Sequence, residues 1–200
     1  MLGPLLFLIY INDMNTVIKN STVYHFTDDT NLLYSHKNPK TLQKIMNKDI
    51  KTLYEWLCAN RLSLNVGKTE FIIFRPPKKS FANRIVLTLN RTKLYESSKI
   101  KYLGLILDSR LTWKDYITEL SKKISRSVGI LYKTRNYCPS TILKSLYHSI
   151  FISHISYGLP VWGYADEIYT KKIYIIQKKA IRAITFSKYR GYSAPILKKL

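Results

Sequence analysis

Two adjacent carboxylates, Asp28 and Asp29, are the residues of this 200-residue chain best placed to do chemistry. They lie between two short runs of aromatic and branched apolar residues that are typical of strands, while the polar residues 27–31 between the runs indicate a turn. Two like charges side by side are unfavourable unless a cation neutralises them, and oxygen ligands of this kind suit Mg²⁺. The pair therefore predicts a metal platform for phosphoryl or nucleotidyl transfer at a hairpin tip. The alternative is an ordinary Asp-rich turn, since Asp and Asn favour turns for local hydrogen-bonding reasons.

The charge of the chain points to a polyanionic partner. There are 33 Lys and Arg residues against 12 Asp and Glu, a net charge of +21, and residues 101–200 alone hold 18 basic and 5 acidic residues. Nucleic acid is the partner that such a balance favours, because solubilising surfaces usually mix both signs. The candidate nucleic-acid-binding residues are basic positions that fall mostly off the apolar face of one predicted helix: Lys122, Lys123, Arg126, Lys133 and Arg135.

The elements that must position the carboxylates form an α+β region. Residues 1–11 are apolar and predict a buried helix, too short to span a membrane and without the basic start of a signal peptide, so no membrane partner is expected. Asn38 and Pro39 indicate the start of a second helix, whose apolar residues share one face. Further strands are expected over residues 70–75, 85–89 and 99–107, antiparallel and in one sheet with the hairpin.

The period of the pattern changes to 3.6 residues from Thr112 onward, and helices are predicted over about 112–135, 140–157 and 167–185. Three helices with short connections form a bundle. The boundary is placed near residues 108–111, which divides the chain into domains 1–110 and 111–200. Cys58 and Cys138 lie far apart without further ligand residues, so reduced thiols in an intracellular protein are expected and no zinc site.

Four stretches resemble, in order and spacing, motifs of the non-LTR retrotransposon (LINE-type, jockey-like) reverse transcriptases. They are the end of the template-positioning motif (residues 3–14), the metal-binding FADDT box (26–30), the lysine-bearing motif (60–70) and the YLG primer-grip strand (101–108). Residues 156–163 and 176–182 are similar to the region after the palm in the same elements. The resemblance covers most of the chain and implies an RNA-directed DNA polymerase.

By this resemblance, residues 1–110 are part of a reverse transcriptase palm, an antiparallel sheet with packed helices, and residues 111–200 are a basic, all-α, thumb-like bundle. Asp28 becomes a principal ligand and Asp29 a supporting ligand of a site that holds two Mg²⁺ ions when complete. Lys68 approaches the leaving pyrophosphate, where a cation stabilises developing charge. Thr27 replaces the Ala that is usual in this family, and as a small β-branched residue it is expected to fit the strand.

The same resemblance assigns Tyr102, Leu103 and Gly104 to a strand that grips the primer backbone, with Gly104 allowing close approach. The implied partners are an RNA template, a DNA primer and deoxynucleoside triphosphates. Nuclear action is implied by the family alone.

One departure from the family pattern matters. The family completes its metal site with a further Asp on a strand upstream of the template-positioning motif, and this chain begins inside that motif. We therefore expect an N-terminally truncated polymerase that is inactive alone and needs the upstream fingers and palm of its polyprotein. The alternative is a non-catalytic remnant that grips a primer–template duplex through its basic helices.

Overall fold

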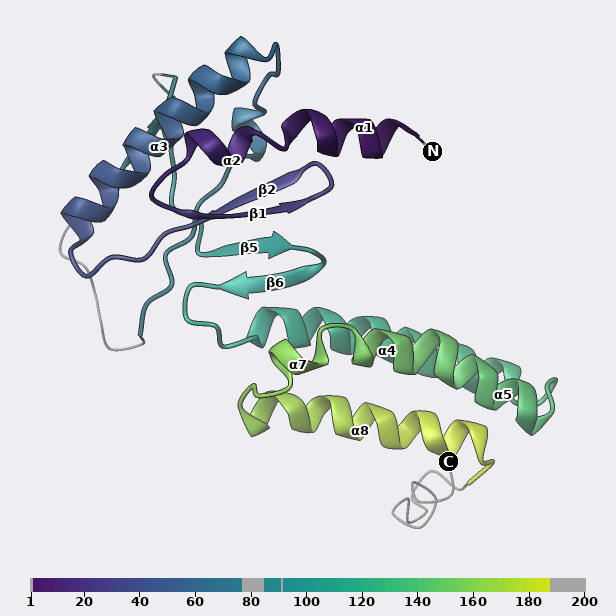
Figure 1. Cartoon of the computed structure of the whole chain (residues 1–200). Coiled ribbons are helices and arrows are strands. Elements are labelled where there is room, and N and C mark those ends of the chain that lie inside the picture. Colours follow the sequence, from purple (N-terminus) through teal and green to yellow (C-terminus); the bar gives the residue numbers. More distant parts are fainter. Residues whose placement is uncertain (1, 77–84, 91, 188–200) are drawn as a thin grey trace. The chain divides into compact units, whose positions relative to one another are not determined.

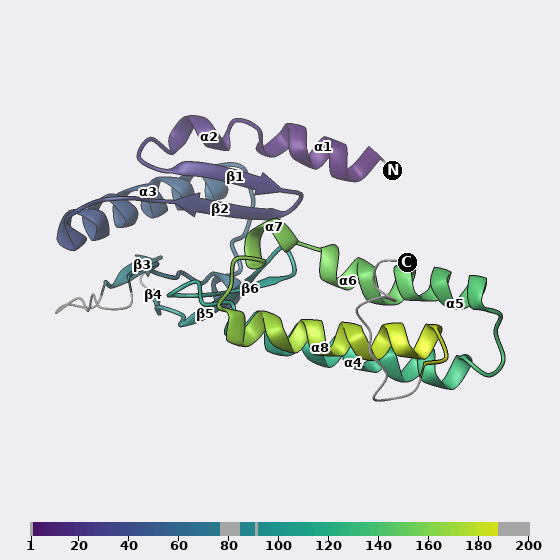
Figure 2. The same cartoon turned by 90° about the horizontal axis from the view of Figure 1, so that it is seen from below.

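The computed structural model of this chain describes residues 2–76, 85–90 and 92–187 (Figures 1 and 2). It consists of helices and small antiparallel sheets, which confirms a mixed α and β composition. The chain packs into two compact units, residues 1–100 and 101–200.

The first unit begins with helices α1 (Leu2–Ile11) and α2 (Met14–Val17), followed by the hairpin strands β1 (Thr22–Phe26) and β2 (Asp29–Leu33). Figures 1 and 2 both show α1 and α2 running along the hairpin. The long helix α3 (Pro39–Ala59) begins where the sequence predicts, because the Asn38 side chain accepts a hydrogen bond from the Lys40 N–H and Pro39 occupies the first turn.

Two apolar clusters hold this unit together. The first joins α1, α2 and the C-terminal part of α3, with Val23 and Leu32 of the hairpin packed against it; its buried members are Ile11, Met14, Ile18, Leu53, Trp56 and Leu57. The second covers the N-terminal half of α3 with the hairpin of β3 (Leu87–Leu89) and β4 (Thr92–Leu94), and includes Phe71. α3 therefore links the carboxylate-bearing hairpin to the rest of the unit.

The prediction of one shared sheet is wrong among the described residues, where the strands form three separate two-stranded sheets. The strand expected over residues 70–75 is reduced to a single bridge between Phe71 and Glu96. In the same region the Ser97 N–H donates a backbone hydrogen bond of 2.9 Å to the Phe71 carbonyl, and Arg75 and Glu96 form an ion pair at 2.7 Å. An isolated bridge and an ion pair therefore stand where a full ladder was expected. Alternation of residue types predicts the faces of a strand and leaves its partner undetermined.

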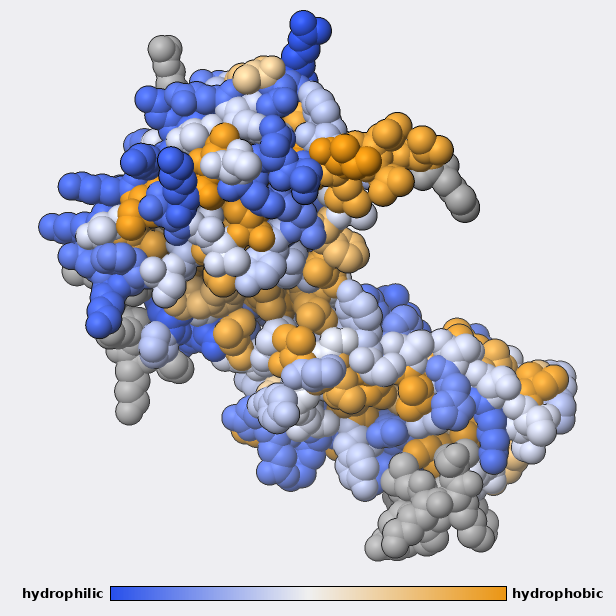
Figure 3. All heavy atoms as spheres, viewed as in Figure 1, coloured by the Kyte–Doolittle hydropathy of each residue, from blue (hydrophilic) through white to orange (hydrophobic). Residues whose placement is uncertain are grey.

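The prediction that the first helix is buried is also wrong. The sequence predicts a buried helix, yet Ile11 is its buried residue, and Leu2 and Ile9 are 68% and 66% exposed. Figure 3 shows it as a projecting apolar helix. Apolar composition does not specify which residues find a neighbour, and in α1 Phe7 and Ile11 pack against the cluster that includes residues of the hairpin and α3. Within the described residues, no helix has both the length and the apolarity needed to cross a bilayer.

The second unit opens with the hairpin of β5 (Lys99–Tyr102) and β6 (Leu105–Asp108), and the division between the units falls inside β5. Its helices are α4 (Lys114–Thr134), α5 (Ser140–Leu146), a π-helical segment (Tyr147–Ile152), α6 (Ser153–Ser156), α7 (Leu159–Trp162) and α8 (Glu167–Ile184). The apolar residues of β6 pack against the helical core: Leu105, Ile106 and Leu107. β6 therefore belongs to the same unit as the helices, whereas the change in sequence period predicts a domain boundary after residue 110.

The predicted helices over 112–135 and 167–185 are confirmed by α4 and α8. The predicted helix over 140–157 is interrupted by the π-helical segment, where Ser127 of α4 donates a hydrogen bond of 2.7 Å to the Ile150 carbonyl. The sequence pattern does not predict α7, because Pro160 is typical of a helix end, whereas it occupies the first turn of α7.

Asp108 connects β6 to α4. Its carboxylate accepts hydrogen bonds from the Arg110 N–H, the Thr112 hydroxyl and the Trp113 N–H at 3.0 to 3.1 Å. These bonds hold a strained link, since Leu111 and Trp113 have φ of 52° and 62°. Partial burial by itself raises the pKa of Asp108, but the hydrogen bonds outweigh it and the pKa lies below its ordinary value.

We expect Asp108→Ala to lower the free energy of unfolding by about 1 kcal/mol at pH 7, because a half-buried carboxylate with three donors is lost. A lowered pKa means that folding favours the charged form, so this contribution is present above the ordinary pKa of 3.8 and is lost as the pH falls through the folded-state value. Urea unfolding at pH 7 and pH 2 measures both effects. A difference between wild type and variant that is as large at pH 2 as at pH 7 contradicts the assignment.

Candidate functional site

The two carboxylates lie at the tip of the first hairpin. Phe26 pairs with Asp29 across the strands, so Thr27 and Asp28 form the two-residue turn. The side chains of Asp28 and Asp29 are both exposed. The prediction of a hairpin with the acidic pair at its tip is therefore confirmed, but the turn is shorter than the predicted residues 27–31 and Asp29 is the first residue of β2.

Thr27 lies in this turn, which corrects the expectation that it fits a strand. Its φ of 53° is an unusual conformation for a β-branched residue. The hydroxyl lies 2.7 Å from the Phe26 carbonyl and 2.9 Å from Oδ1 of Asp28, and it donates its single proton to one of them at a time. Backbone strain of this kind occurs often at functional sites, where the surrounding structure maintains it.

Polar contacts with α2 and α3 fix the hairpin at two points, one beside its tip and one just before β1. His25 contacts the Thr30 hydroxyl through Nδ1 at 3.2 Å and Oδ1 of Asn15 in α2 through Nε2 at 3.0 Å. At the second point Asp49 of α3, 3% exposed, accepts hydrogen bonds from the backbone and the side chain of Asn20 at 3.2 and 2.7 Å. These contacts join α2 and α3 to the element that carries the carboxylates.

Asp49 is a positioning residue that the sequence pattern does not reveal, since it occupies one polar position on the apolar face of α3. Its charge also acts on Tyr34, which lies beyond the end of β2. Burial is the main cause that raises the pKa of the Tyr34 hydroxyl to about 12, and the Asp49 charge adds to it.

A hollow of about 270 Å³ adjoins the turn. It is lined by Gly3, Pro4 and Phe7 of α1 and by Thr27 and Asp28. The fold thus brings the first of the four motifs next to the second, with the Asp28 carboxylate at the edge of a mostly apolar depression.

The residues present fit one hard cation. Asp28 and Asp29 are exposed and adjacent, and neither takes part in an ion pair within the described residues. Mg²⁺ is commonly held by one or two carboxylates together with substrate phosphates and water. In the part of the chain that the structure describes, no group of three or more His, Cys, Asp or Glu residues could hold a metal ion by protein ligands alone. The remaining ligands of a cation at Asp28 and Asp29 would therefore have to come from substrate and water.

Lys68 ends a short 3₁₀ turn, Val66–Lys68, and is exposed. Its backbone N–H lies 3.2 Å from the Asn65 side-chain oxygen, which shapes the turn. Within the described residues, the Lys68 side chain forms no ion pair with the carboxylates, and it does not line the hollow beside Asp28. The proximity expected from the sequence motif stays a prediction.

Tyr102, Leu103 and Gly104 are expected from the sequence in one continuous strand, and this is wrong. Leu103 and Gly104 have φ of 45° and 79° and form the two-residue turn between β5 and β6. Two positive φ values are what a tight hairpin requires, and Gly meets this requirement without strain. The YLG residues therefore occupy a hairpin tip, with Tyr102 as the last residue of β5.

Tyr157 holds this tip in place from the helical part of the same unit. Its hydroxyl donates a hydrogen bond to the Leu103 carbonyl, and its ring lies on one side of Gly104, where an added Cβ would lie 3.4 Å from Cε1. The Trp162 indole N–H donates to the Tyr157 carbonyl at 2.9 Å. We call these contacts the Tyr157 clasp.

Gly158 completes the clasp. It has a φ of 63°, and a Cβ on it would lie 2.9 Å from Cδ2 of Leu105. We expect Gly158→Ala to lower the free energy of unfolding by about 1–3 kcal/mol, because the backbone is strained and Leu105 must move.

Gly129 provides the matched control. It lies inside α4 with open space around its Cα, so Gly129→Ala should raise the free energy of unfolding by about 0.5–1 kcal/mol. Chemical denaturation followed by circular dichroism measures both variants. Shifts of the same sign would contradict this account of Gly158.

The basic residues predicted to bind nucleic acid differ in their exposure and contacts. Lys122, Lys123, Arg126 and Lys133 are exposed on α4. The Arg135 guanidinium instead lies 4.8 Å from the centre of the Phe186 ring and 5.7 Å from that of Tyr132. Such cation–π contacts commit Arg135 to packing and leave it less available to a phosphate.

Comparison with known proteins gives one family. Residues 1–107 match the model of the family described as reverse transcriptase (RNA-dependent DNA polymerase). No solved structure matches the chain significantly.

Several curated relatives cover most of the chain. The probable RNA-directed DNA polymerase from transposon X-element of Drosophila melanogaster is 25% identical over 195 residues, 92% of this chain and 21% of the relative. The RNA-directed DNA polymerase from mobile element jockey of the same species is 26% identical over 199 residues, with the same coverage. The retrovirus-related Pol polyprotein from type-1 retrotransposable element R1 of Bradysia coprophila is 24% identical over 166 residues, 80% of this chain and 16% of the relative. The chain thus spans about a fifth of the length of the relatives that it matches.

Proposed function

We propose a function for this chain on the basis of its family, since it belongs to the reverse transcriptase (RNA-dependent DNA polymerase) family. The relatives from mobile elements confirm the resemblance that the four motifs carry. We propose that the chain is part of an RNA-directed DNA polymerase of a non-LTR retrotransposon. The observation that carries this proposal is the exposed Asp28–Asp29 pair at a hairpin tip, beside the helix that bears the first motif.

In this proposal, residues 1–110 are the C-terminal part of a palm and residues 111–200 are a thumb-like helical region. Packing into two units, the second of them dominated by helices, supports two parts, although residues 101–110 pack with the second unit. The second unit also carries the larger share of the positive charge, +13 over residues 101–200.

Asp28 and Asp29 would hold Mg²⁺ together with phosphate oxygens of the incoming nucleotide, and the bound metal would supply positive charge for nucleotidyl transfer to a primer 3′-oxygen. Asp28 carries most of this role, since it lies in the turn and borders the hollow. Lys68 is proposed to stabilise charge on the leaving pyrophosphate, which its exposed ammonium group could do after substrate binds.

The β5–β6 tip is proposed to contact the primer backbone. Gly104 is exposed and has no side chain, so a phosphate or sugar could come close to its backbone N–H. The Tyr157 clasp would keep Leu103 and Gly104 in position while the primer moves by one nucleotide.

A second candidate function is non-catalytic binding of a primer–template duplex. The exposed cations of α4 favour it, because phosphate contacts by Lys and Arg supply affinity without sequence preference. For either function we propose nuclear action, on family grounds.

Primer extension tests the proposal. The 200-residue chain is joined to the fingers and upstream palm of the jockey relative and given an RNA template, a DNA primer, deoxynucleoside triphosphates and Mg²⁺. We expect extension that stops when the metal is chelated, and no extension by the 200 residues alone, because two adjacent carboxylates clamp two ions poorly. A folded, duplex-binding fusion that never extends the primer supports the non-catalytic alternative. Robust extension by the chain alone shows that the metal site is misplaced.

A further inference from the structure

Helix α3 carries a row of lysines on the side opposite its packed face. Four exposed lysines recur at intervals of three or four residues, which places them on one side of the helix: Lys40, Lys44, Lys48 and Lys51. We call them the α3 lysine row. From the first to the last of them the rise along the helix is about 16 Å. Figure 3 shows hydrophilic side chains gathered over this part of the first unit.

The row lies across α3 from the carboxylate hairpin. The packed face of α3 carries the apolar residues of both clusters of the first unit, and also Asp49, which contacts Asn20 just before β1. Asp49 is nine positions from Lys40, or about two and a half turns of the helix, so the two side chains leave the helix on opposite sides. A ligand held by the row is therefore separated by α3 from the hairpin that bears Asp28 and Asp29.

The row is unfavourable for the helix itself. Lys40 and Lys44 are like charges four residues apart, as are Lys44 and Lys48, and such pairs destabilise a helix. The first turn of α3 holds no acidic residue and its last turn no basic one, so Lys40 adds positive charge at the positive end of the helix dipole. Among the described residues, only Lys51 of the row forms an ion pair, at 3.9 Å with the equally exposed Glu55. Local stability does not account for the row, and an external anion would relieve this repulsion.

The chemistry of this face favours phosphate over a protein or a membrane. The described residues include all of α3, and no large apolar side chain of this helix is exposed. Protein interfaces have an apolar core, and helices that lie on membranes insert apolar side chains. Lysine side chains contact phosphate oxygens without reading the base sequence. A straight row along one helix thus suits the backbone of a nucleic-acid strand.

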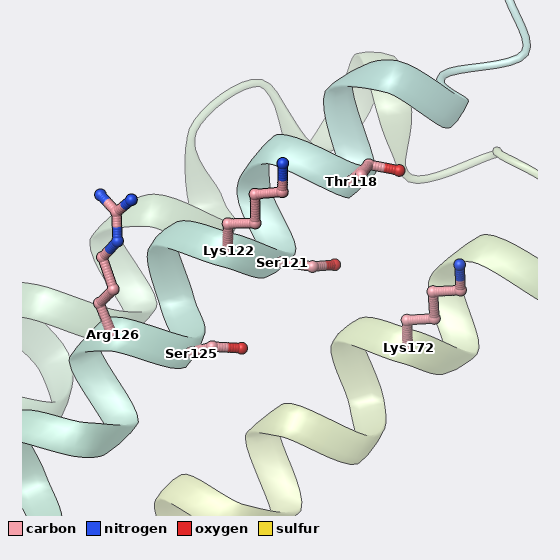
Figure 4. A pocket seen from close by; sticks show the side chains of 6 residues that line it. All are labelled: Thr118, Ser121, Lys122, Ser125, Arg126 and Lys172. Carbon is pink, nitrogen blue, oxygen red and sulfur yellow. The ribbon is translucent and has the colours of Figure 1, made fainter.

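The cations of the helical unit have a different setting. Lys122 and Arg126 of α4 and Lys172 of α8 line an open groove of about 480 Å³ together with three hydroxyl-bearing residues (Figure 4). That groove belongs to the candidate function of duplex binding. The α3 lysine row is part of the other unit, on a helix that carries none of the four motifs. Neither polymerase chemistry nor duplex binding by α4 requires it.

We propose that the α3 lysine row is a second nucleic-acid site, which binds the phosphate backbone of a segment that is not in the polymerase site. The segment is RNA or DNA, since both present the same phosphates. This inference goes beyond the proposed function, because it adds a binding surface and leaves the parts assigned to Asp28, Lys68 and the β5–β6 tip unchanged.

The first test maps which lysines a ligand covers. The 200-residue chain is acetylated briefly with and without ligand, and the modification of each lysine is measured by mass spectrometry. With single-stranded RNA or double-stranded DNA at about ten times its Kd, acetylation of Lys44 and Lys48 should slow about 10-fold, because about nine-tenths of the sites are occupied. Lys93, an exposed lysine of the same unit outside α3, should react at an unchanged rate. Protection by one of the two polymers identifies the segment as RNA or as DNA.

The second test removes three charges of the row. The chain carrying Lys40→Ala, Lys44→Ala and Lys48→Ala is compared with a matched variant that loses three exposed lysines of the same unit outside α3: Lys19→Ala, Lys93→Ala and Lys99→Ala. Single-stranded RNA is titrated at several salt concentrations. We expect the row variant to reduce the slope of log affinity against log salt by about 2, at roughly 0.7 per phosphate contact, and the matched variant by less than about 1.

Folding and catalysis provide two further measurements on the row variant. Its free energy of unfolding should stay the same or rise, because Ala favours the helix and the repulsion between lysines is removed. In the fusion polymerase, the row variant should extend a short primer–template at the wild-type rate. Extension as slow as that of Lys68→Ala would place the row in the polymerase site and overturn the second site.

The outcomes separate this inference from the proposed function. Unprotected Lys44 and Lys48, with Lys122 and Lys133 of α4 protected by an RNA–DNA duplex, overturn the row and leave the proposed function standing. Absence of protection at every lysine overturns both the row and duplex binding by α4. Equal slope changes in the two triple variants also overturn the row. Polyglutamate at the same concentration of charge is the last ligand, and protection as strong as that by nucleic acid would assign the row to an acidic protein instead.

Discussion

Asp28→Asn in the fusion polymerase should abolish primer extension, with a loss of roughly 10³-fold or more. Asn keeps the size of the side chain and one oxygen but loses the negative charge, and charge is what Mg²⁺ requires of its ligands. Metal ions contribute several kcal/mol of transition-state stabilisation in such reactions, which corresponds to this loss. The measurement is single-turnover extension by one nucleotide at saturating primer–template.

Three further substitutions test whether the effect on primer extension is specific to the Asp28 carboxylate. Asp29→Asn should be less severe if this residue only supports the site. Lys68→Ala should lower the rate of extension with a modest effect on nucleotide binding, as expected of a contact made mainly in the transition state. Glu55→Gln is the matched control, because Glu55 is an exposed carboxylate of the same unit and lies outside the four motifs. A fusion that is equally active with and without the Asp28 carboxylate refutes the metal assignment.

The 200-residue chain should bind primer–template duplex with little sequence preference and with strong dependence on salt. Between 50 and 200 mM salt we expect a loss of affinity of about 10³- to 10⁵-fold, the range for about 6–10 phosphate contacts. The net charge of +13 over residues 101–200 is large enough for that number of contacts, although not every cation can face one duplex.

Fluorescence anisotropy with two duplexes of unrelated sequence, each at several salt concentrations, measures both properties. Affinity that does not change with salt would exclude backbone contact as the main source of binding. A large preference for one duplex would indicate base contacts, which neither the α4 cations nor the groove predicts.

Much of the local structure could be predicted from the sequence because it depends on neighbouring residues. The turn at residues 27–28 follows from polar residues between two strand-like runs, and α3 begins at Pro39 because Asn38 caps it. The apolar faces of α4 and α8 follow from the helical period. The order and spacing of the four motifs are sufficient to indicate the family.

Other features depend on contacts between residues far apart in the chain. The exposure of α1 and the separation of the sheets depend on which surfaces meet, and a pattern of residue types leaves this open. Tyr157 reaches Leu103 across 54 positions, and Asn20 reaches Asp49 across 29, so neither contact has a local signal.

The candidate sites divide in the same way. The sequence by itself determined that Asp28 and Asp29 are adjacent at a turn, since their neighbouring positions and local propensities are sufficient for that. Only the tertiary structure decided that α1 borders Asp28, that Arg135 is held by aromatic rings, and that Lys172 joins Lys122 and Arg126 in one groove. Helical periodicity fixes the face of each helix but not which face of another helix it meets, because that choice is made by the packing of the whole core.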